Sequence, residues 1–189
     1  MKILGIMGSP RLKSNTDLLL DEALRGAQSL GAEIEKIIVD KLDITPCREY
    51  YGCLKDGNCV IRDDMDDIYP KLVAADGIIV ASPIFFYGLS AQLKALVDRS
   101  QALWARRYVL KNLPVSIRKG AYIAVGATRG KQLFDGTILT VGYFFDAIGV
   151  EYADELLVRG IDARGEIKQH PDVLSQACEL GKRLVGKTP

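Results

Sequence analysis

Short apolar runs alternate along the chain with longer segments that have helical periodicity. Three of the runs, LGIM, GIIVA and AYIAV, are nearly continuous, which is typical of parallel strands covered by helices on both faces. The run Glu33-Ile34-Glu35-Lys36-Ile37 instead alternates between polar and apolar residues, as in a strand at the edge of a sheet. The five predicted strands are Ile3–Met7, Glu33–Val39, Gly77–Ala81, Ala121–Val125 and Tyr152–Val158.

Apolar residues at helical spacing predict a helix in each interval and after the last strand. Between the first two strands, Leu20, Leu24 and Ala27 share one helical face, and either Ser14 or Asn15 can cap the helix. The five predicted helices are Thr16–Ser29, Asp66–Ala75, Ser90–Arg107, Phe134–Ile148 and Asp172–Leu184. These segments therefore give a strict alternation of strand and helix.

Such an alternation is the pattern of a parallel sheet with helices on both faces. We predict one α/β domain over residues 1–189, a flavodoxin-like three-layer sandwich whose five parallel strands have the order 2-1-3-4-5. In such sheets ligands bind beyond the carboxyl ends of the strands where the winding reverses, here after the first and third strands. The one long irregular segment runs from Lys41 to Met65.

Length, composition and charge narrow the class of protein. The 189 residues are 48% hydrophobic and 26% charged, which fits one soluble domain with a sizeable core. With 25 Lys and Arg against 24 Asp and Glu, the net charge of +1 gives no electrostatic case for nucleic acid. No apolar run approaches the roughly 18 residues that span a bilayer. We therefore expect a cytoplasmic protein with no membrane partner, whose four cysteines are thiols or metal ligands.

The loop after the first strand collects groups that bind phosphate. Ser9 and Arg11 follow the strand, and Ser14, Asn15 and Thr16 stand at the start of the helix. Hydroxyl groups, backbone N–H groups and the positive end of the helix dipole converge there, and the guanidinium adds a charge-assisted contact. The glycines of a Walker loop or a dinucleotide fingerprint are absent. An ordinary helix cap has the same residues, but the place at the switch point favours a metal-free phosphate site.

Two further loops lie at the same predicted edge of the sheet. The third strand is followed by Pro83, Ile84, Phe85, Phe86, Tyr87 and Gly88. Aromatic residues at this place can line a flat ring and shield it from water, or they can pack under the next helix or at a subunit interface. The fourth strand is followed by Gly126, Thr128 and Arg129, which can close the same pocket.

The order of these motifs resembles the NADPH-dependent FMN reductase family. The resemblance rests on Gly8-Ser9-Pro10-Arg11 with Ser14-Asn15-Thr16, on Ser82 to Gly88, and on Lys94 with Asp98-Arg99. It implies that FMN is held at its phosphate by the first loop and at its ring by Pro83 to Gly88, in a homodimer or homotetramer. It also implies an NAD(P)H-dependent oxidoreductase that reduces free flavin, a quinone or another small acceptor. We predict no catalytic side chain, because hydride transfer at a flavin requires none.

Within this family the chain is most similar to the iron–sulfur flavoproteins, because Thr45-Pro46-Cys47 opens a segment with three cysteines. Cys47, Cys53 and Cys59 are each separated by five residues, and Tyr50 stands where that branch has its second cysteine. A [4Fe–4S] cluster normally takes four thiolates, and Cys178 lies far away on the last predicted helix. The segment is a degenerate site, a three-cysteine cluster or a set of redox or packing thiols. We favour loss of the cluster.

Two other functions remain open. An electron carrier that exchanges electrons with ferredoxin-type partners would fit the resemblance to the iron–sulfur branch. A structural or regulatory domain without flavin would fit a first loop that is only a helix cap.

Overall fold

The computed structural model describes residues 1–113 and 118–186, and it contains a five-stranded sheet with the order β2-β1-β3-β4-β5. Every neighbouring pair of strands is parallel. The strands are β1 (Lys2–Met7), β2 (Glu33–Ile38), β3 (Gly77–Pro83), β4 (Arg118–Gly126) and β5 (Val150–Arg159). The predicted flavodoxin-like topology is confirmed, and β2 lies at one edge, as its alternating pattern indicated.

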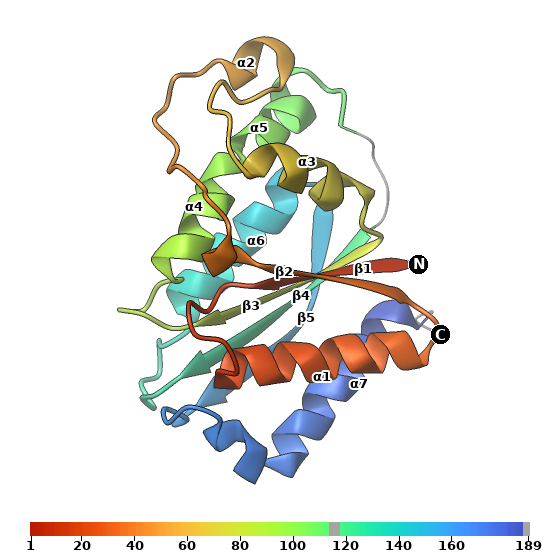
Figure 1. The fold of residues 1–189 in the computed structure, drawn as a ribbon, viewed down its shortest axis with the longest axis vertical. Helices are drawn as coiled ribbons and strands as arrows, with labels where there is room; N and C mark the ends of the chain where they lie inside the picture. The colour runs from red at the N-terminus through yellow and green to blue at the C-terminus, as the bar shows by residue number, and fades with distance from the viewer. Residues whose placement is uncertain (114–117, 187–189) are drawn as a thin grey trace.

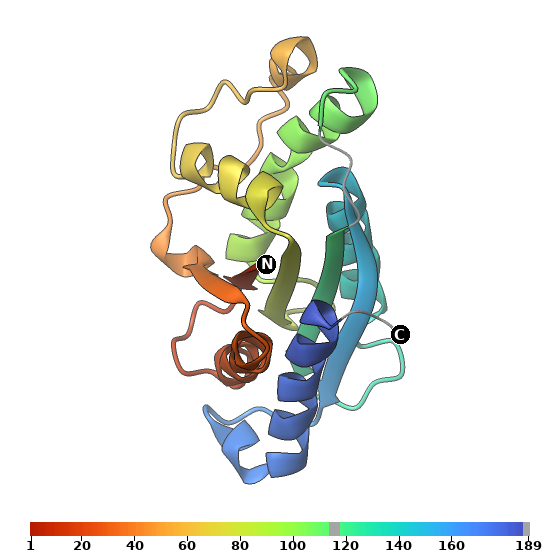
Figure 2. The same cartoon turned by 90° about the vertical axis from the view of Figure 1, so that its right-hand side faces the viewer.

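Helices cover both faces of the sheet (Figures 1 and 2). The five longer helices are α1 (Asn15–Ser29), α3 (Met65–Ala74), α4 (Ala91–Arg99), α6 (Asp135–Ala147) and α7 (Pro171–Val185). The shorter elements are η1 (Val39–Lys41), α2 (Cys53–Asp56), α5 (Gln101–Trp104), the π-helix η2 (Ala105–Val109) and η3 (Glu166–Gln169). Within the described residues, every helix is too short or too polar to cross a membrane.

The sheet separates two hydrophobic clusters, because successive residues of a strand point to opposite faces. Leu4 and Ile6 of β1 pack with residues of α3, α4, α5 and α6 on one face. Ile3 and Met7 pack with residues of α1 and α7 on the other face. The α/β sandwich therefore has three layers, as predicted.

The prediction of one continuous helix over Ser90–Arg107 is wrong. The segment is divided into α4, α5 and η2, with the first break at Ser100, whose φ of −67° and ψ of 0° depart from helical values. Directly before the break, the side chain of Arg99 is buried and directed toward the segment that precedes α3. The break therefore coincides with a long-range anchor that apolar spacing does not reveal.

Candidate functional site

The carboxyl ends of β1 and β3 are tied to the start of α4. The hydroxyl group of Ser90 caps α4 by accepting from Leu93 N at 3.2 Å and donates to Gly8 O at 2.5 Å. Gly8 N in turn donates to Ala81 O at 2.8 Å. A Cβ at Gly8 would lie 2.7 Å from Leu93 Cδ2 and 3.0 Å from Ala81 O, so this close approach requires glycine. The loops that follow the two strands therefore leave the sheet side by side.

The first loop is ordered by its own hydrogen bonds. Ser14 caps α1, because its Oγ accepts from Asp17 N at 3.2 Å. The carboxylate of Asp17 accepts from Lys13 N at 2.7 Å, which holds Lys13 in the left-handed region with φ of +55°. Ser9 Oγ accepts from Arg11 N at 3.2 Å. The turn into the helix is therefore preorganised, as an anion site at a helix N-terminus requires.

Four segments at this edge of the sheet enclose a cavity of about 160 Å³. Its lining residues are Ser9, Pro10, Arg11, Ser14, Asn15 and Thr16 of the first loop, Pro83, Ile84 and Phe85 of the second, Val125 and Ala127 at the end of β4, and Ile161, Asp162 and Arg164 after β5. All five residues predicted for phosphate binding thus border one cavity, next to the first half of the predicted ring-binding loop.

The side chain of Asn15 has a role that the sequence did not indicate. Its Nδ2 donates to Ala163 O at 2.9 Å, and its Oδ1 accepts from Ile167 N at 3.1 Å. The amide group therefore fixes the loop after β5 against the start of α1. The side chain of Asn15 is therefore already bonded, and only its backbone N–H can donate to an anion. The first N–H groups of a helix have no hydrogen-bond partner within the helix.

Arg164 is a cavity residue that the sequence analysis missed. It is an exposed residue of the loop after β5, and its Nη2 donates to Leu12 O at 2.9 Å across the cavity wall. It brings a second guanidinium to the cavity that Arg11 already lines. The predicted topology could have indicated Arg164, because the loop after the fifth parallel strand must lie at the same edge of the sheet as the first loop.

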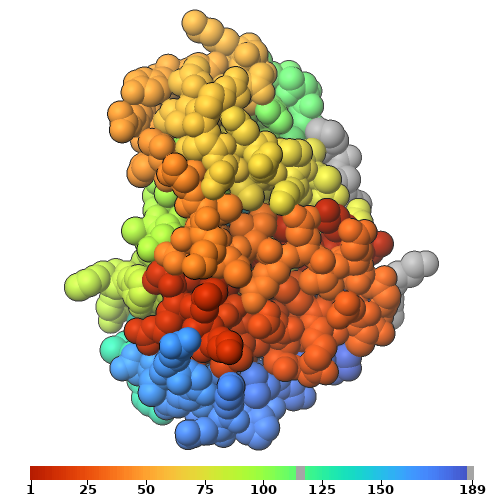
Figure 3. All heavy atoms as spheres, in the orientation of Figure 1, coloured from red at the N-terminus to blue at the C-terminus, as the bar shows by residue number. Residues whose placement is uncertain are grey.

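The second loop divides into two parts. Phe85 and Gly88 exchange backbone hydrogen bonds of 3.0 and 2.9 Å, so that Phe86 and Tyr87 form a tight turn with φ of +48° and +61°. The left-handed region is unfavourable for aromatic residues. This turn projects from the body of the molecule, and the side chain of Phe86 is fully exposed (Figure 3, yellow-green). Whereas Phe85 lines the cavity, Phe86, Tyr87 and Gly88 lie outside it.

The third loop lies at the same edge but contributes less than predicted. Gly126 O accepts from Gly160 N at 2.8 Å, which joins the ends of β4 and β5. The side chain of Arg129 packs over Gly160, where a Cβ would come within 2.9 Å of the guanidinium. The cavity lining includes Ala127 but not Gly126, Thr128 or Arg129. In this structure Gly126 and Arg129 support the neighbouring loop instead.

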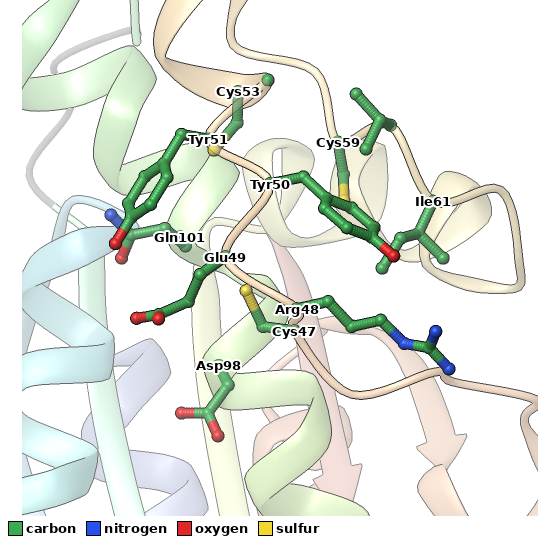
Figure 4. A pocket seen from close by; sticks show the side chains of 12 residues that line it. Cys47, Arg48, Glu49, Tyr50, Tyr51, Cys53, Cys59, Ile61, Asp98 and Gln101 are labelled. Atoms are coloured by element: carbon green, nitrogen blue, oxygen red, sulfur yellow. The ribbon is translucent and has the colours of Figure 1, made fainter.

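A second cavity, of about 550 Å³, lies in the segment that precedes α3 (Figure 4). Cys47, Cys53 and Cys59 all line it, together with Asp98 of α4 and Gln101 of α5. The cysteines are free thiols. Burial raises the pKa of the Cys53 thiol, and the neighbouring Cys59 contributes to the same shift. Among the described residues, no group of three or more His, Cys, Asp or Glu side chains is arranged to hold a metal ion.

A buried ion pair holds the base of this segment. Arg99 donates to both carboxylate oxygens of Asp63, at 2.5 and 3.1 Å, and to the carbonyl oxygens of Thr45 and Ile61. Burial by itself would raise the pKa of Asp63, but hydrogen bonds from Arg99 and from the backbone N–H groups of Thr45 and Met65 outweigh burial and lower that pKa. The segment is thus attached to the end of α4 at a fixed position.

Comparison with known proteins assigns the chain to a family. A family model described as NADPH-dependent FMN reductase matches residues 1–148. The chain belongs to this family. The FMN reductase family is a family of flavin-dependent NAD(P)H oxidoreductases.

Two curated relatives and one solved structure illustrate the range of this family. An iron-sulfur flavoprotein of Methanosarcina thermophila is 43% identical over 129 residues, which are 68% of this chain and 65% of the relative, slightly less than two thirds of its length. The Bacillus subtilis protein YwqN, named as an NAD(P)H-dependent FMN-containing oxidoreductase, is 30% identical over 97% of this chain and 98% of its own. An NAD(P)H:quinone oxidoreductase of Methanothermobacter marburgensis has a TM-score of 0.79 at 16% identity and covers 100% of this chain and 98% of its own, which shows the common fold.

Proposed function

We propose that this protein uses FMN to take electrons from NADH or NADPH and to pass them to free flavin, a quinone or another small acceptor. The observation that carries the proposal is the cavity in which hydroxyl groups, a helix N-terminus and two guanidinium groups meet at the switch point of the sheet. In doubly wound sheets this is the place where ligands bind.

The residues of the cavity fit the phosphate of FMN. Ser9, Ser14 and Thr16 offer hydroxyl donors to phosphate oxygens, and the start of α1 offers backbone N–H groups. Arg11 and Arg164 supply positive charge. A volume of about 160 Å³ suits a phosphate and part of the chain attached to it, so the ring would lie against Pro83 to Phe85 at the mouth.

Bound FMN would supply two-electron chemistry, and the chain would supply binding and orientation. The hydrogen bonds between Ser90, Gly8 and Ala81 fix the distance between the phosphate loop and the ring loop. The exposed turn at Phe86 and Tyr87 stands beside the mouth, where a nicotinamide or an acceptor would approach the ring.

Anaerobic mixing of the FMN-loaded protein with NADH or NADPH tests this function. We expect the flavin absorption to bleach with at least one of the two nucleotides, and to return when a quinone or free flavin is added. A flavin that binds but stays oxidised with both nucleotides would contradict the proposal. Protein that stays colourless after FMN is added would contradict the assignment of the cavity itself.

The name of the Methanosarcina relative favours one alternative, a protein that carries electrons between other proteins. In that function the flavin would stay oxidised with NADH and NADPH but would be reduced by a ferredoxin-type donor. The same anaerobic experiment, repeated with reduced ferredoxin, therefore distinguishes the two functions.

A further inference from the structure

The three cysteines of the second cavity have the spacing of an incomplete iron–sulfur site. Cluster-binding cysteines recur in runs of the form Cys-x2-Cys-x2-Cys, and a [4Fe–4S] cluster takes four thiolates. Cys47, Tyr50 and Cys53 follow one another at this interval, and Cys59 comes next along the cavity wall. A tyrosine therefore occupies the middle position of an otherwise intact run.

Tyr50 is a poor replacement for a cysteine in this geometry. Its oxygen stands at the far end of a rigid ring, several bonds further from the backbone than a cysteine sulfur. Figure 4 shows the hydroxyl group directed toward Ile61 and away from Cys47 and Cys53. A phenol has an ordinary pKa of about 10 against about 8.5 for a thiol, so it gives up its proton to a metal less readily.

The backbone on either side of Tyr50 has an unusual conformation. Glu49 and Tyr51, on either side of it, have φ of +53° and +56°, in the left-handed region that non-glycine residues rarely adopt. The base of the segment is fixed by Arg99 and Asp63. Tyr50 therefore lies in a strained stretch of the segment, with its hydroxyl group directed away from Cys47 and Cys53.

Other side chains near the cavity do not provide a fourth soft ligand. Cys178 is on α7, which packs against α1 on the opposite face of the sheet, and its carbonyl oxygen faces Gly26. Asp98 and Glu49 line the cavity with carboxylates, whereas iron–sulfur clusters select thiolates, and Asp98 is paired with Lys94 at 2.7 Å.

We propose that this cavity is an iron–sulfur site disabled by Tyr50, and that the chain binds no stoichiometric cluster. The three thiols instead line an open cavity of about 550 Å³. What this means for electron transfer rests on the proposed function: electrons would enter and leave the protein at the flavin, without a cluster. The relative named as an iron-sulfur flavoprotein would then differ from this protein in how electrons leave the flavin.

Restoring the missing thiol tests the proposal. The variants are Tyr50→Cys, which completes the run, and Tyr51→Cys, which adds a thiol at the neighbouring position with the wrong spacing. Wild type and both variants are purified and incubated with iron and sulfide without oxygen. The readouts are iron and acid-labile sulfide per chain, absorption beyond the flavin bands, and FMN content.

We expect little iron in the wild type and in Tyr51→Cys, and about four iron and four sulfide per chain in Tyr50→Cys. Stoichiometric iron with sulfide in the wild type would overturn the proposal, as would equal iron in the two variants. A folded, FMN-binding Tyr50→Cys protein without a cluster would also overturn it. If that variant fails to fold, the iron content of the wild type still decides. Because FMN is measured separately, failure of the proposed function gives a different result, which is protein without flavin.

Discussion

Arg164 reaches the cavity that we propose for the FMN phosphate from a part of the chain far from the first loop. We expect Arg164→Gln to weaken FMN binding by roughly 10- to 100-fold, since a charge-assisted hydrogen bond contributes about 1.5–3 kcal/mol. Riboflavin has no phosphate, so its affinity should change little. Titration of the apoprotein with each flavin, followed by fluorescence quenching, measures the two effects.

Lys168→Gln is the matched control for this experiment. Lys168 is an exposed cation of the same C-terminal region, in η3, and it does not line the cavity. Its loss should leave the FMN affinity within about twofold of wild type, since it removes only an exposed charge that lies outside the cavity lining and is screened by solvent. Equal losses for FMN and riboflavin in Arg164→Gln would show a structural effect and would contradict a phosphate contact.

The buried pair of Arg99 and Asp63 gives a second prediction at this scale. Their side chains are 0% and 4% exposed, so Arg99→Gln leaves a carboxylate uncompensated. We expect the free energy of unfolding to fall by about 3–5 kcal/mol. Arg62→Gln breaks an exposed pair with Asp66 and should cost less than about 1 kcal/mol. Urea unfolding of both variants measures the difference, and similar losses would contradict the prediction.

The depressed pKa of Asp63 predicts a pH dependence of stability. A carboxyl group whose pKa is lowered in the folded state stabilises the fold above its ordinary pKa of about 3.9. This contribution is lost as the pH falls through the folded-state pKa. We therefore expect the wild type to lose stability below about pH 4, and Asp63→Asn to lose less over the same range. Parallel pH profiles in urea unfolding would contradict this assignment.

The contacts of single residues show where sequence reasoning reaches its limit. Ser14 was one of two cap candidates in the sequence, because a hydroxyl group before a helical run can accept from the first N–H groups of the helix. The amide contacts of Asn15 and the position of Arg164 depend on contacts between segments 148 to 152 residues apart. Their side chains become part of the site through tertiary structure, which local patterns do not describe.

At the scale of elements, the strands were easier to predict than the helix breaks. The continuous runs around Ile78 and Ile123 are buried on both faces, and burial of this kind leaves a clear pattern. The break at Ser100 leaves none, because Leu96 and Leu103 on either side keep their apolar spacing and are both buried. The partner that draws Arg99 inward is Asp63, 36 residues away.

The crossing of α1 and α7 gives a prediction for Gly26, and Gly142 of α6 serves as its control. A Cβ at Gly26 would lie 2.0 Å from the carbonyl oxygen of Cys178, so Gly26→Ala should separate the helices and cost about 1–3 kcal/mol. Gly142 of α6 has nothing within 4 Å of a Cβ, so Gly142→Ala should raise helix stability by up to about 1 kcal/mol. Thermal unfolding of both variants measures the effects, and destabilisation by Gly142→Ala would contradict this account.

At the scale of the whole molecule, one surface stands out as a candidate contact between copies of the chain. Leu139 and Tyr143 are one helical turn apart on α6, and they are 62% and 70% exposed. Tyr108 of η2 extends the surface, since its hydroxyl group donates to Asp146 at the end of α6. Contiguous exposed apolar side chains of this kind mark interaction sites more often than scattered ones do.

We therefore propose that the protein forms a homodimer or homotetramer through this surface of α6. Leu139→Arg with Tyr143→Arg should convert the assembly to a monomer of about 20.7 kDa, because buried unpaired charges oppose association. Leu30→Arg, at a leucine after α1 that is 52% exposed, should leave the assembly unchanged. Sedimentation equilibrium measures the mass of all three proteins. A monomeric wild type, or a double variant that keeps the wild-type mass, would contradict this use of α6. The circular dichroism spectrum of the double variant separates loss of assembly from loss of fold.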